Sequence, residues 1–162
     1  MILAGGKGSR IKEYTRDIPK PLILANGKPL IQYIIDQYAS FGVKNIYILG
    51  GYKINEFIKY FDNTYTKTTN PDVFLTQNDV SINVVDTGLD SMTGYRILSG
   101  MNHIIEENFY LTYGDGVSNV DIKKLTDFHF QNKKIATVTA VRPPARFGSL
   151  NIEKQLVVKF GE

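Results

Sequence analysis

The first ten residues place a short apolar segment directly before a glycine-rich turn. Ile2, Leu3 and Ala4 run into the stretch Gly5-Gly6-Lys7-Gly8-Ser9-Arg10. Glycine adopts positive φ readily and lets the backbone approach a ligand closely. Successive backbone N–H groups in such a turn form a concave site for anions, and the Arg10 guanidinium adds a planar set of donors suited to phosphate. The stretch therefore predicts a strand followed by a phosphate-binding loop.

Two other phosphate-binding motifs do not fit this loop. A P-loop requires G-x-x-x-x-G-K-[ST], and the sequence has no such segment. A dinucleotide fingerprint requires G-x-G-x-x-G; Gly6 and Gly8 supply two glycines, but Ile11 occupies the third position. A plain tight turn after a strand remains an open alternative when the loop is considered alone.

Composition narrows the class of protein. The length of 162 residues favours one domain. The net charge is +3, and the positively charged residues are scattered along the chain. A mildly basic chain suits a phosphate-rich small ligand but lacks the basic stripe of a nucleic-acid-binding protein. With no cysteine there is no disulfide framework or thiolate metal site, and neither a membrane span nor a signal peptide is visible. We expect a cytoplasmic protein that binds neither nucleic acid nor membrane.

Apolar spacing predicts strands alternating with helices, without an internal repeat. This pattern is typical of the α/β class, a three-layer αβα arrangement with a mostly parallel sheet. In such sheets ligands bind at the carboxyl ends of the strands. We expect strands at 2–4, 45–49, 73–75, 82–85, 109–113, 135–140, 150–152 and 156–160, and helices at 29–41, 54–61, 95–107 and after 121.

Residues 11–28 are expected to be irregular. Pro19 and Pro21 each restrict the residue before them, which predicts an extended conformation for Lys20 between them. Lys20 could neutralise phosphate from that segment, although a solvated lysine between two prolines is the simpler alternative. Asn26-Gly27 predicts a turn.

Asp115 stands between Gly114 and Gly116, directly after a predicted strand. A carboxylate there can reach a Mg²⁺ ion that bridges phosphates. The alternative is an aspartate favoured in a glycine-rich turn because it bonds its own backbone. Asp115 and the loop at 4–10 both follow strands, so they could share one crevice.

Ser91 and Arg96 flank a predicted loop-to-helix junction, where a helix N-terminus favours anions. Both could face a nucleotide; the alternative is a helix cap and a surface arginine. His103 and His129 have no partner at metal-ligand spacing, so we expect structural roles for them. Together the candidate groups suit phosphoryl-type displacement, which depends on positioning and charge stabilisation more than on a protein nucleophile.

The segment Leu3-Ala4-Gly5-Gly6-x-Gly8-Ser9-Arg10, with Pro19-Lys20-Pro21 downstream, resembles the signature of sugar-1-phosphate nucleotidyltransferases. Three further segments resemble one branch of that superfamily, the glucose-1-phosphate cytidylyltransferases. They are Val85-Asp86-Thr87-Gly88-x-x-Ser91-Met92-Thr93-Gly94-x-Arg96, Thr112-Tyr113-Gly114-Asp115-Gly116, and Pro143-Pro144-x-Arg146-Phe147-Gly148.

The resemblance implies a Rossmann-like nucleotidyltransferase fold, dependence on Mg²⁺, and assembly into homo-oligomers. It implies that CTP and a sugar 1-phosphate, α-D-glucose 1-phosphate, react to CDP-glucose and pyrophosphate. Arg10 and Lys20 would then be catalytic, and Asp115 would hold the metal ion. The nucleotide-binding residues would be Leu3, Ala4, Gly5, Gly6, Lys7, Gly8, Ser9, Arg10, Lys20, Ser91, Arg96 and Gly114.

The chain also departs from the family pattern. Lys7 stands where the family has an apolar residue, and the family continues beyond Glu162 into a region with sugar contacts and a second metal-binding aspartate. The resemblance therefore predicts that residues 1–162 form a truncated catalytic domain, which alone binds Mg²⁺–CTP weakly and turns over poorly. A transferase with another base or sugar phosphate, or a non-catalytic nucleotide-binding module, remains an alternative.

Overall fold

The computed structural model describes residues 1–142 and 149–161, which form two compact units, Met1–Asn119 and Val120–Glu162. The segment at 143–148, which carried part of the family resemblance, lies outside the described residues. The prediction of one domain over residues 1–162 stays a prediction.

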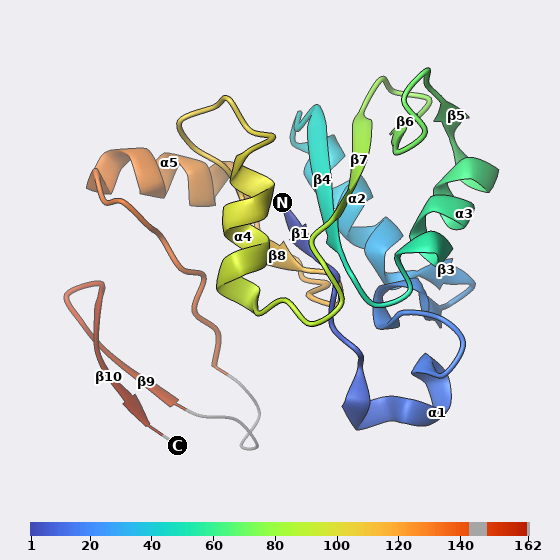
Figure 1. The fold of residues 1–162 in the computed structure, drawn as a ribbon. Coiled ribbons are helices and arrows are strands. Elements are labelled where there is room, and N and C mark those ends of the chain that lie inside the picture. The colour runs from blue at the N-terminus through green and yellow to red at the C-terminus, as the bar shows by residue number, and fades with distance from the viewer. Residues whose placement is uncertain (143–148, 162) are drawn as a thin grey trace. The chain divides into compact units, whose positions relative to one another are not determined.

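The first unit is built on a six-stranded sheet with the order β5-β6-β7-β4-β1-β8 (Figure 1). The four strands β7, β4, β1 and β8 are parallel, whereas β5 and β6 join the edge in antiparallel pairing. The mostly parallel sheet predicted from the sequence is confirmed. The strands are β1 (Ile2–Leu3), β4 (Asn45–Gly50), β5 (Thr66–Lys67), β6 (Val73–Leu75), β7 (Ser81–Asp86) and β8 (Thr112–Tyr113).

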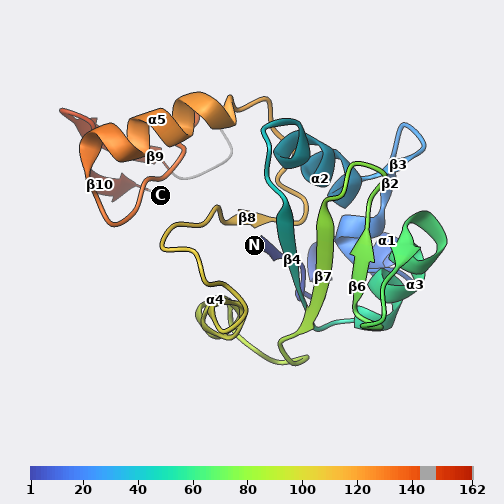
Figure 2. The ribbon, with the colours of Figure 1, turned by 90° about the horizontal axis from the view of Figure 1, so that it is seen from above.

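Helices cover both faces of this sheet because side chains alternate along its strands. Ile2 and Ile48 belong to the core shared with α2 (Leu30–Ser40) and α3 (Ile54–Thr64). Leu3 and Leu49 belong to a second core, against which Ile97 of α4 (Thr93–Met101) packs. Figure 2 shows α2 and α4 on opposite sides of β1 and β4. The three-layer arrangement is therefore confirmed.

The region predicted to be irregular contains short elements, and the extended conformation predicted for Lys20 is wrong. Lys20 opens a 3₁₀ turn, Lys20–Leu22, in which the Leu22 amide donates to the Pro19 carbonyl at 2.9 Å. Pro21 fits the second position because a turn needs no donor there. The other elements are a 3₁₀ turn at Ser9–Ile11, α1 (Lys12–Thr15), and a hairpin of β2 (Leu24–Ala25) and β3 (Lys28–Pro29) around Asn26-Gly27.

Two predicted elements are shorter in the structure. The helix expected at 95–107 ends at Met101, because the next backbone bonds, from Asn102, His103 and Ile104, reach back only three residues. Such bonds tighten a helix end into turns. The strand expected at 109–113 is reduced to the two residues of β8.

The second unit contains α5 (Ile122–Asn132) and a hairpin of β9 (Ser149–Glu153) and β10 (Leu156–Gly161). Asp121 caps α5 as predicted, accepting a bond from the Lys124 amide at 3.0 Å. The strand predicted at 135–140 is wrong: these residues lie outside any helix or strand. Their composition is typical of a strand, but a strand also requires backbone pairing, and the ladder described in this unit joins only β9 and β10.

Within residues 1–142 and 149–161, every helix is too short or too polar to span a bilayer. The cytoplasmic location stays a prediction.

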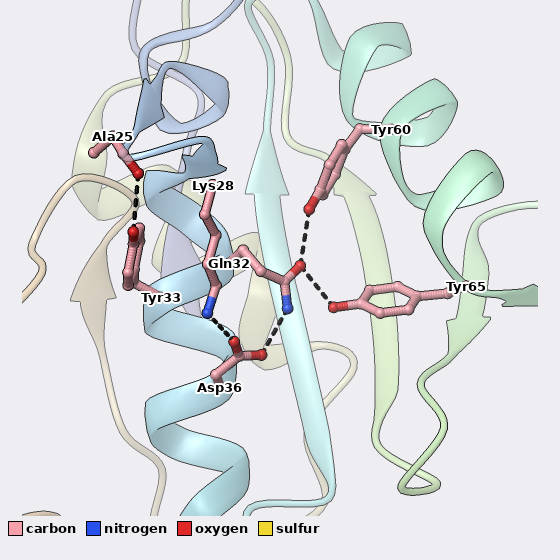
Figure 3. Close-up of polar contacts among 7 residues, drawn as sticks. All are labelled: Ala25, Lys28, Gln32, Tyr33, Asp36, Tyr60 and Tyr65. Atoms are coloured by element: carbon pink, nitrogen blue, oxygen red, sulfur yellow. Dashed lines mark hydrogen bonds and ion pairs between the residues drawn. The ribbon is translucent and has the colours of Figure 1, made fainter.

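A polar network joins α2 to the end of α3 (Figure 3). The hydroxyls of Tyr60 and Tyr65 donate to Gln32 Oε1 at 2.9 and 2.7 Å, and Gln32 Nε2 donates to Asp36 at 2.7 Å. Tyr65 also stacks on Phe61, with 5.9 Å between ring centroids. Burial raises the pKa of Tyr65 to about 12, and the bond to Gln32 acts in the opposite direction. The network therefore ties the C-terminal end of α3 to α2.

A substitution at Phe57 tests the packing of the core beneath α3, because this side chain is 0% exposed. Replacing Phe57 with alanine leaves a cavity and should lower the free energy of unfolding by about 3–5 kcal/mol. Urea unfolding followed by circular dichroism measures this change. The control is Leu24→Ala, at a side chain 62% exposed; equal losses in the two variants would contradict the described core.

Tyr65 also predicts a pH dependence at high pH. Its hydroxyl ionises near pH 10 in the unfolded chain but at about 12 in the folded chain, so the unfolded state binds fewer protons between these values. Stability should therefore fall as pH rises from 10 to 12, and Tyr65→Phe should reduce that slope. Tyr14→Phe, at a ring 63% exposed, is the control; identical slopes in Tyr65→Phe and the parent chain would refute this account.

Candidate functional site

The strand order places a crevice between β1 and β8. From β1 the chain passes to β4 and then β7 on one side, whereas β8 pairs with β1 on the other side. Connections after β1 and β8 therefore leave in opposite directions, and such switch points are where ligands bind in parallel sheets. A pocket of about 290 Å³ lies at the carboxyl ends of these two strands. The structure thus brings the loop after β1 next to Asp115, as the sequence suggested.

Most of the predicted site residues line this pocket. Among the residues whose side chains the structure describes, the exceptions are Lys7 and Ser9: Lys7 forms an exposed ion pair with Asp90 at 2.8 Å, and Ser9 lies in the 3₁₀ turn that follows the loop. The side chain of Arg10 lies outside what the structure describes. The lining residues are Leu3, Ala4, Gly5, Gly6, Gly8, Lys20, Pro21, Ser91, Met92, Thr93, Arg96, Tyr113, Gly114 and Asp115.

Two glycines are required by the backbone of this pocket. Gly8 has φ +63°, which L side chains rarely adopt. At Gly114 a Cβ atom would lie 2.6 Å from Pro21 Cγ. The end of β8 can therefore lie against the proline next to Lys20 only because residue 114 has no side chain.

Lys20 and Asp115 form an ion pair across the pocket, from Nζ to Oδ2. Their side chains are 39% and 35% exposed, so both heads remain accessible to a ligand. An ammonium group can neutralise phosphate, and Mg²⁺ is commonly held by one or two carboxylates together with substrate phosphates. In the described part of the chain no three acidic or histidine side chains converge. Asp115 therefore fits a Mg²⁺ ion whose other ligands are phosphate oxygens and water.

Arg96 lies deeper, at 5% exposure. Its Nη1 donates to the Gly50 and Gly88 carbonyls, both at 2.8 Å, and its Nη2 donates to the Gly5 carbonyl at 3.1 Å. Burial lowers the pKa of this guanidinium, and the nearby carboxylates, Asp86 first, act in the opposite direction. Contact between Arg96 and a nucleotide stays a prediction, because these bonds are to the chain's own backbone.

Ser91 donates through its hydroxyl to the carbonyl of Thr87. This bond closes the loop between β7 and α4, and Ser91 contributes to the pocket wall from that loop. Nucleotide binding by Ser91 likewise stays a prediction.

Sequence reasoning missed several residues of the site. Met92 and Tyr113 line the pocket and are 79% and 59% exposed; both stand in segments that carried the family resemblance, next to Ser91 and Gly114, but neither was predicted to be a site residue. Thr15 was also missed: it is 2% exposed and donates to the Gly8 carbonyl at 3.1 Å. Tyr52 supports the same loop, because its amide donates to the Gly5 carbonyl at 3.3 Å.

A second pocket, of about 240 Å³, lies at the opposite edge of the sheet. It is lined by the amino-terminal ends of β1 and β4 and by aromatic side chains, including Tyr38, Tyr47 and Phe109. The glycine loop, Lys20 and Asp115 line the first pocket. The groups suited to binding phosphate therefore lie there and not at the second pocket.

Comparison with known proteins identifies the family of this chain. The profile of the family described as "Nucleotidyl transferase" matches residues 1–162. The chain is 36% identical to the probable glucose-1-phosphate cytidylyltransferase of Bacillus subtilis (strain 168) and 38% identical to the glucose-1-phosphate cytidylyltransferase of Salmonella typhi. Each match covers 100% of this chain and 67% of the relative.

The fold of this chain also resembles that of a solved protein structure. The crystal structure of HddC from Yersinia pseudotuberculosis complexed with GMP-PN superposes with a TM-score of 0.73 at 24% identity, over 99% of this chain and 67% of that one. At this identity the likeness concerns the fold alone. The full-length profile match and the two cytidylyltransferase relatives together show that the chain belongs to the nucleotidyl transferase family of enzymes.

Proposed function

We propose that this chain serves the transfer of a cytidylyl group from CTP to glucose 1-phosphate, giving CDP-glucose and pyrophosphate. One observation carries the proposal: the glycine loop and the Lys20–Asp115 pair meet in one pocket at the switch point of the sheet. The two relatives named as glucose-1-phosphate cytidylyltransferases support the choice of base and sugar. Homo-oligomeric assembly, implied by the resemblance, is part of the same proposal.

The proposed reaction is a displacement at phosphorus. A phosphate oxygen of the sugar phosphate forms a bond to the α-phosphorus of CTP, and the bond to the β-phosphate oxygen breaks, so pyrophosphate carries away the electron pair. Such a reaction needs aligned reactants and compensation of negative charge. We expect the backbone amides of residues 5–10 and the cations Arg10 and Lys20 to hold the triphosphate. Mg²⁺ bound through Asp115 would add positive charge at the phosphates.

The chain spans 67% of the length of these relatives. Nucleotide binding is the primary test of the proposal. A transferase with another base or sugar phosphate, or a module that binds nucleotide without catalysis, is the alternative that the same measurement separates.

A thermal-shift panel tests base selectivity. With Mg²⁺ present, CTP should raise the melting temperature more than UTP, dTTP, ATP or GTP, because a ligand that binds only the folded state stabilises it by mass action, by about 2.7 kcal/mol at a hundredfold excess over Kd. Adding glucose 1-phosphate and following pyrophosphate release then separates an enzyme from a binding module. Equal shifts for all five nucleotides would contradict cytidine selectivity, and no shift would contradict the proposed function.

Asp115→Asn tests the metal site at nearly constant shape. The variant should lose the Mg²⁺-dependent part of CTP affinity, roughly tenfold or more, which corresponds to about 1.4 kcal/mol. Isothermal titration calorimetry with and without Mg²⁺ measures this difference. Asp62→Asn, at a surface ion pair with Lys67 on the α3 side, is the control. A Mg²⁺ response that is unchanged in Asp115→Asn would remove Asp115 from the site.

A further inference from the structure

We propose that Arg96 is a positioning residue, which holds the glycine loop in its phosphate-binding shape by joining the ends of β1, β4 and β7. The ligand in this inference rests on the proposed function, whereas the effect on the loop does not. Arg96 would therefore act through the backbone, and its main partners would be carbonyl groups rather than the nucleotide.

The bonds of the guanidinium carry the inference. Besides the carbonyls of Gly5, Gly50 and Gly88, it contacts Thr87 Oγ1 at 2.5 Å from Nη1 and the Leu89 carbonyl at 3.2 Å from Nη2. These acceptors follow or end three different strands. Arginine presents its donors in a rigid planar fork, so one side chain can bind acceptors from three connecting segments at once. A lysine has one ammonium group and could not span them.

Two glycines make room for the guanidinium. A Cβ atom on Gly5 would lie 2.1 Å from Arg96 Nη1, and one on Gly51 would lie 2.5 Å from the same atom. Neither residue is among the described glycines with positive φ. Close approach of Arg96 therefore explains why residues without side chains stand at 5 and 51.

Thr87 contacts the guanidinium without lining the pocket. It is 4% exposed and is not one of the residues that line the pocket. Its hydroxyl accepts from Arg96 and donates to the Gly50 carbonyl, and its amide donates to the same carbonyl at 3.2 Å. Thr87 therefore offers a way to disturb Arg96 without touching a bound nucleotide.

The consequence for phosphate binding follows from the planarity of the peptide bond. In a trans peptide the C=O of one residue and the N–H of the next point in opposite directions, and the described chain has no cis peptide. Arg96 Nη2 and the Tyr52 amide both hold the Gly5 carbonyl. The Gly6 N–H must then point away from the guanidinium, and that orientation is what a phosphate-binding loop needs to have in place before the ligand arrives.

The test compares Arg96→Lys and Thr87→Val with Ile82→Val, a control in the core of β7 at 0% exposure, where loss of a buried methyl group lowers global stability without touching the loop. Hydrogen exchange in the ligand-free chain reports on the amides of residues 5–9 and Tyr52, and calorimetry gives the Kd for Mg²⁺–CTP. Conditions are chosen so that the variants are equally far from unfolding, which removes the effect of global stability.

Arg96→Lys should speed exchange in the loop and weaken CTP binding roughly tenfold or more, about 1.4 kcal/mol, although the positive charge is retained. Thr87→Val should change both quantities in the same direction, and the double variant should show less than the sum of the single effects because the two side chains are in contact. Ile82→Val should change neither at matched stability.

Loop exchange that matches the control in Arg96→Lys would overturn the inference. Weaker binding with unchanged exchange would also overturn it, because it would make Arg96 a direct nucleotide contact. If Arg96→Lys does not fold, Thr87→Val alone decides by the same two criteria. If the parent chain binds no nucleotide, the proposed function fails, and the exchange result still decides whether Arg96 positions the loop.

Discussion

The pairing of β1 on both of its edges is the constraint on which the rest of the structure depends. Ile2 and Leu3 pair with Ile48 and Leu49 of β4 on one side and with β8 on the other. A strand of two residues has few backbone bonds, so burial of alternate side chains in the two cores must hold it in register. Because β1 is fixed in this way, the glycine loop leaves the sheet beside the end of β8.

Polar contacts then decide the shape of the site. The Lys20–Asp115 pair is partly exposed, and exposed ion pairs contribute little to stability, typically about 0–1 kcal/mol. Its importance is therefore chemical, because it sets a cation beside a carboxylate at the pocket. Arg96 is the opposite case: it is buried, and its terminal nitrogens are bonded to backbone and hydroxyl acceptors. Removing such partners from a buried charge is costly, which suits a residue that fixes loops.

Much of the architecture follows from local sequence. Periodic apolar residues predicted α2, α3 and the strands β4 and β7, and the turn at Asn26-Gly27 and the cap at Asp121 came from single-residue preferences. The predictions were wrong where local conformational preference did not decide the structure. The composition of 135–140 favours a strand, but strand formation depends on a pairing partner elsewhere in the chain. The turn at Lys20 formed because proline restricts, but does not forbid, a single tight turn.

The sequence by itself determined the glycine loop, the candidate cation Lys20, the candidate carboxylate Asp115 and the α/β class, because these depend on residue type and spacing along the chain. Only the tertiary structure decided that β8 lies beside β1, that Tyr113 and Met92 join the pocket, and that Arg96 faces backbone carbonyls. The bond between Arg96 and Gly5 joins residues 91 positions apart. Contacts over such separations depend on how strands and helices pack, which spacing along the chain does not specify.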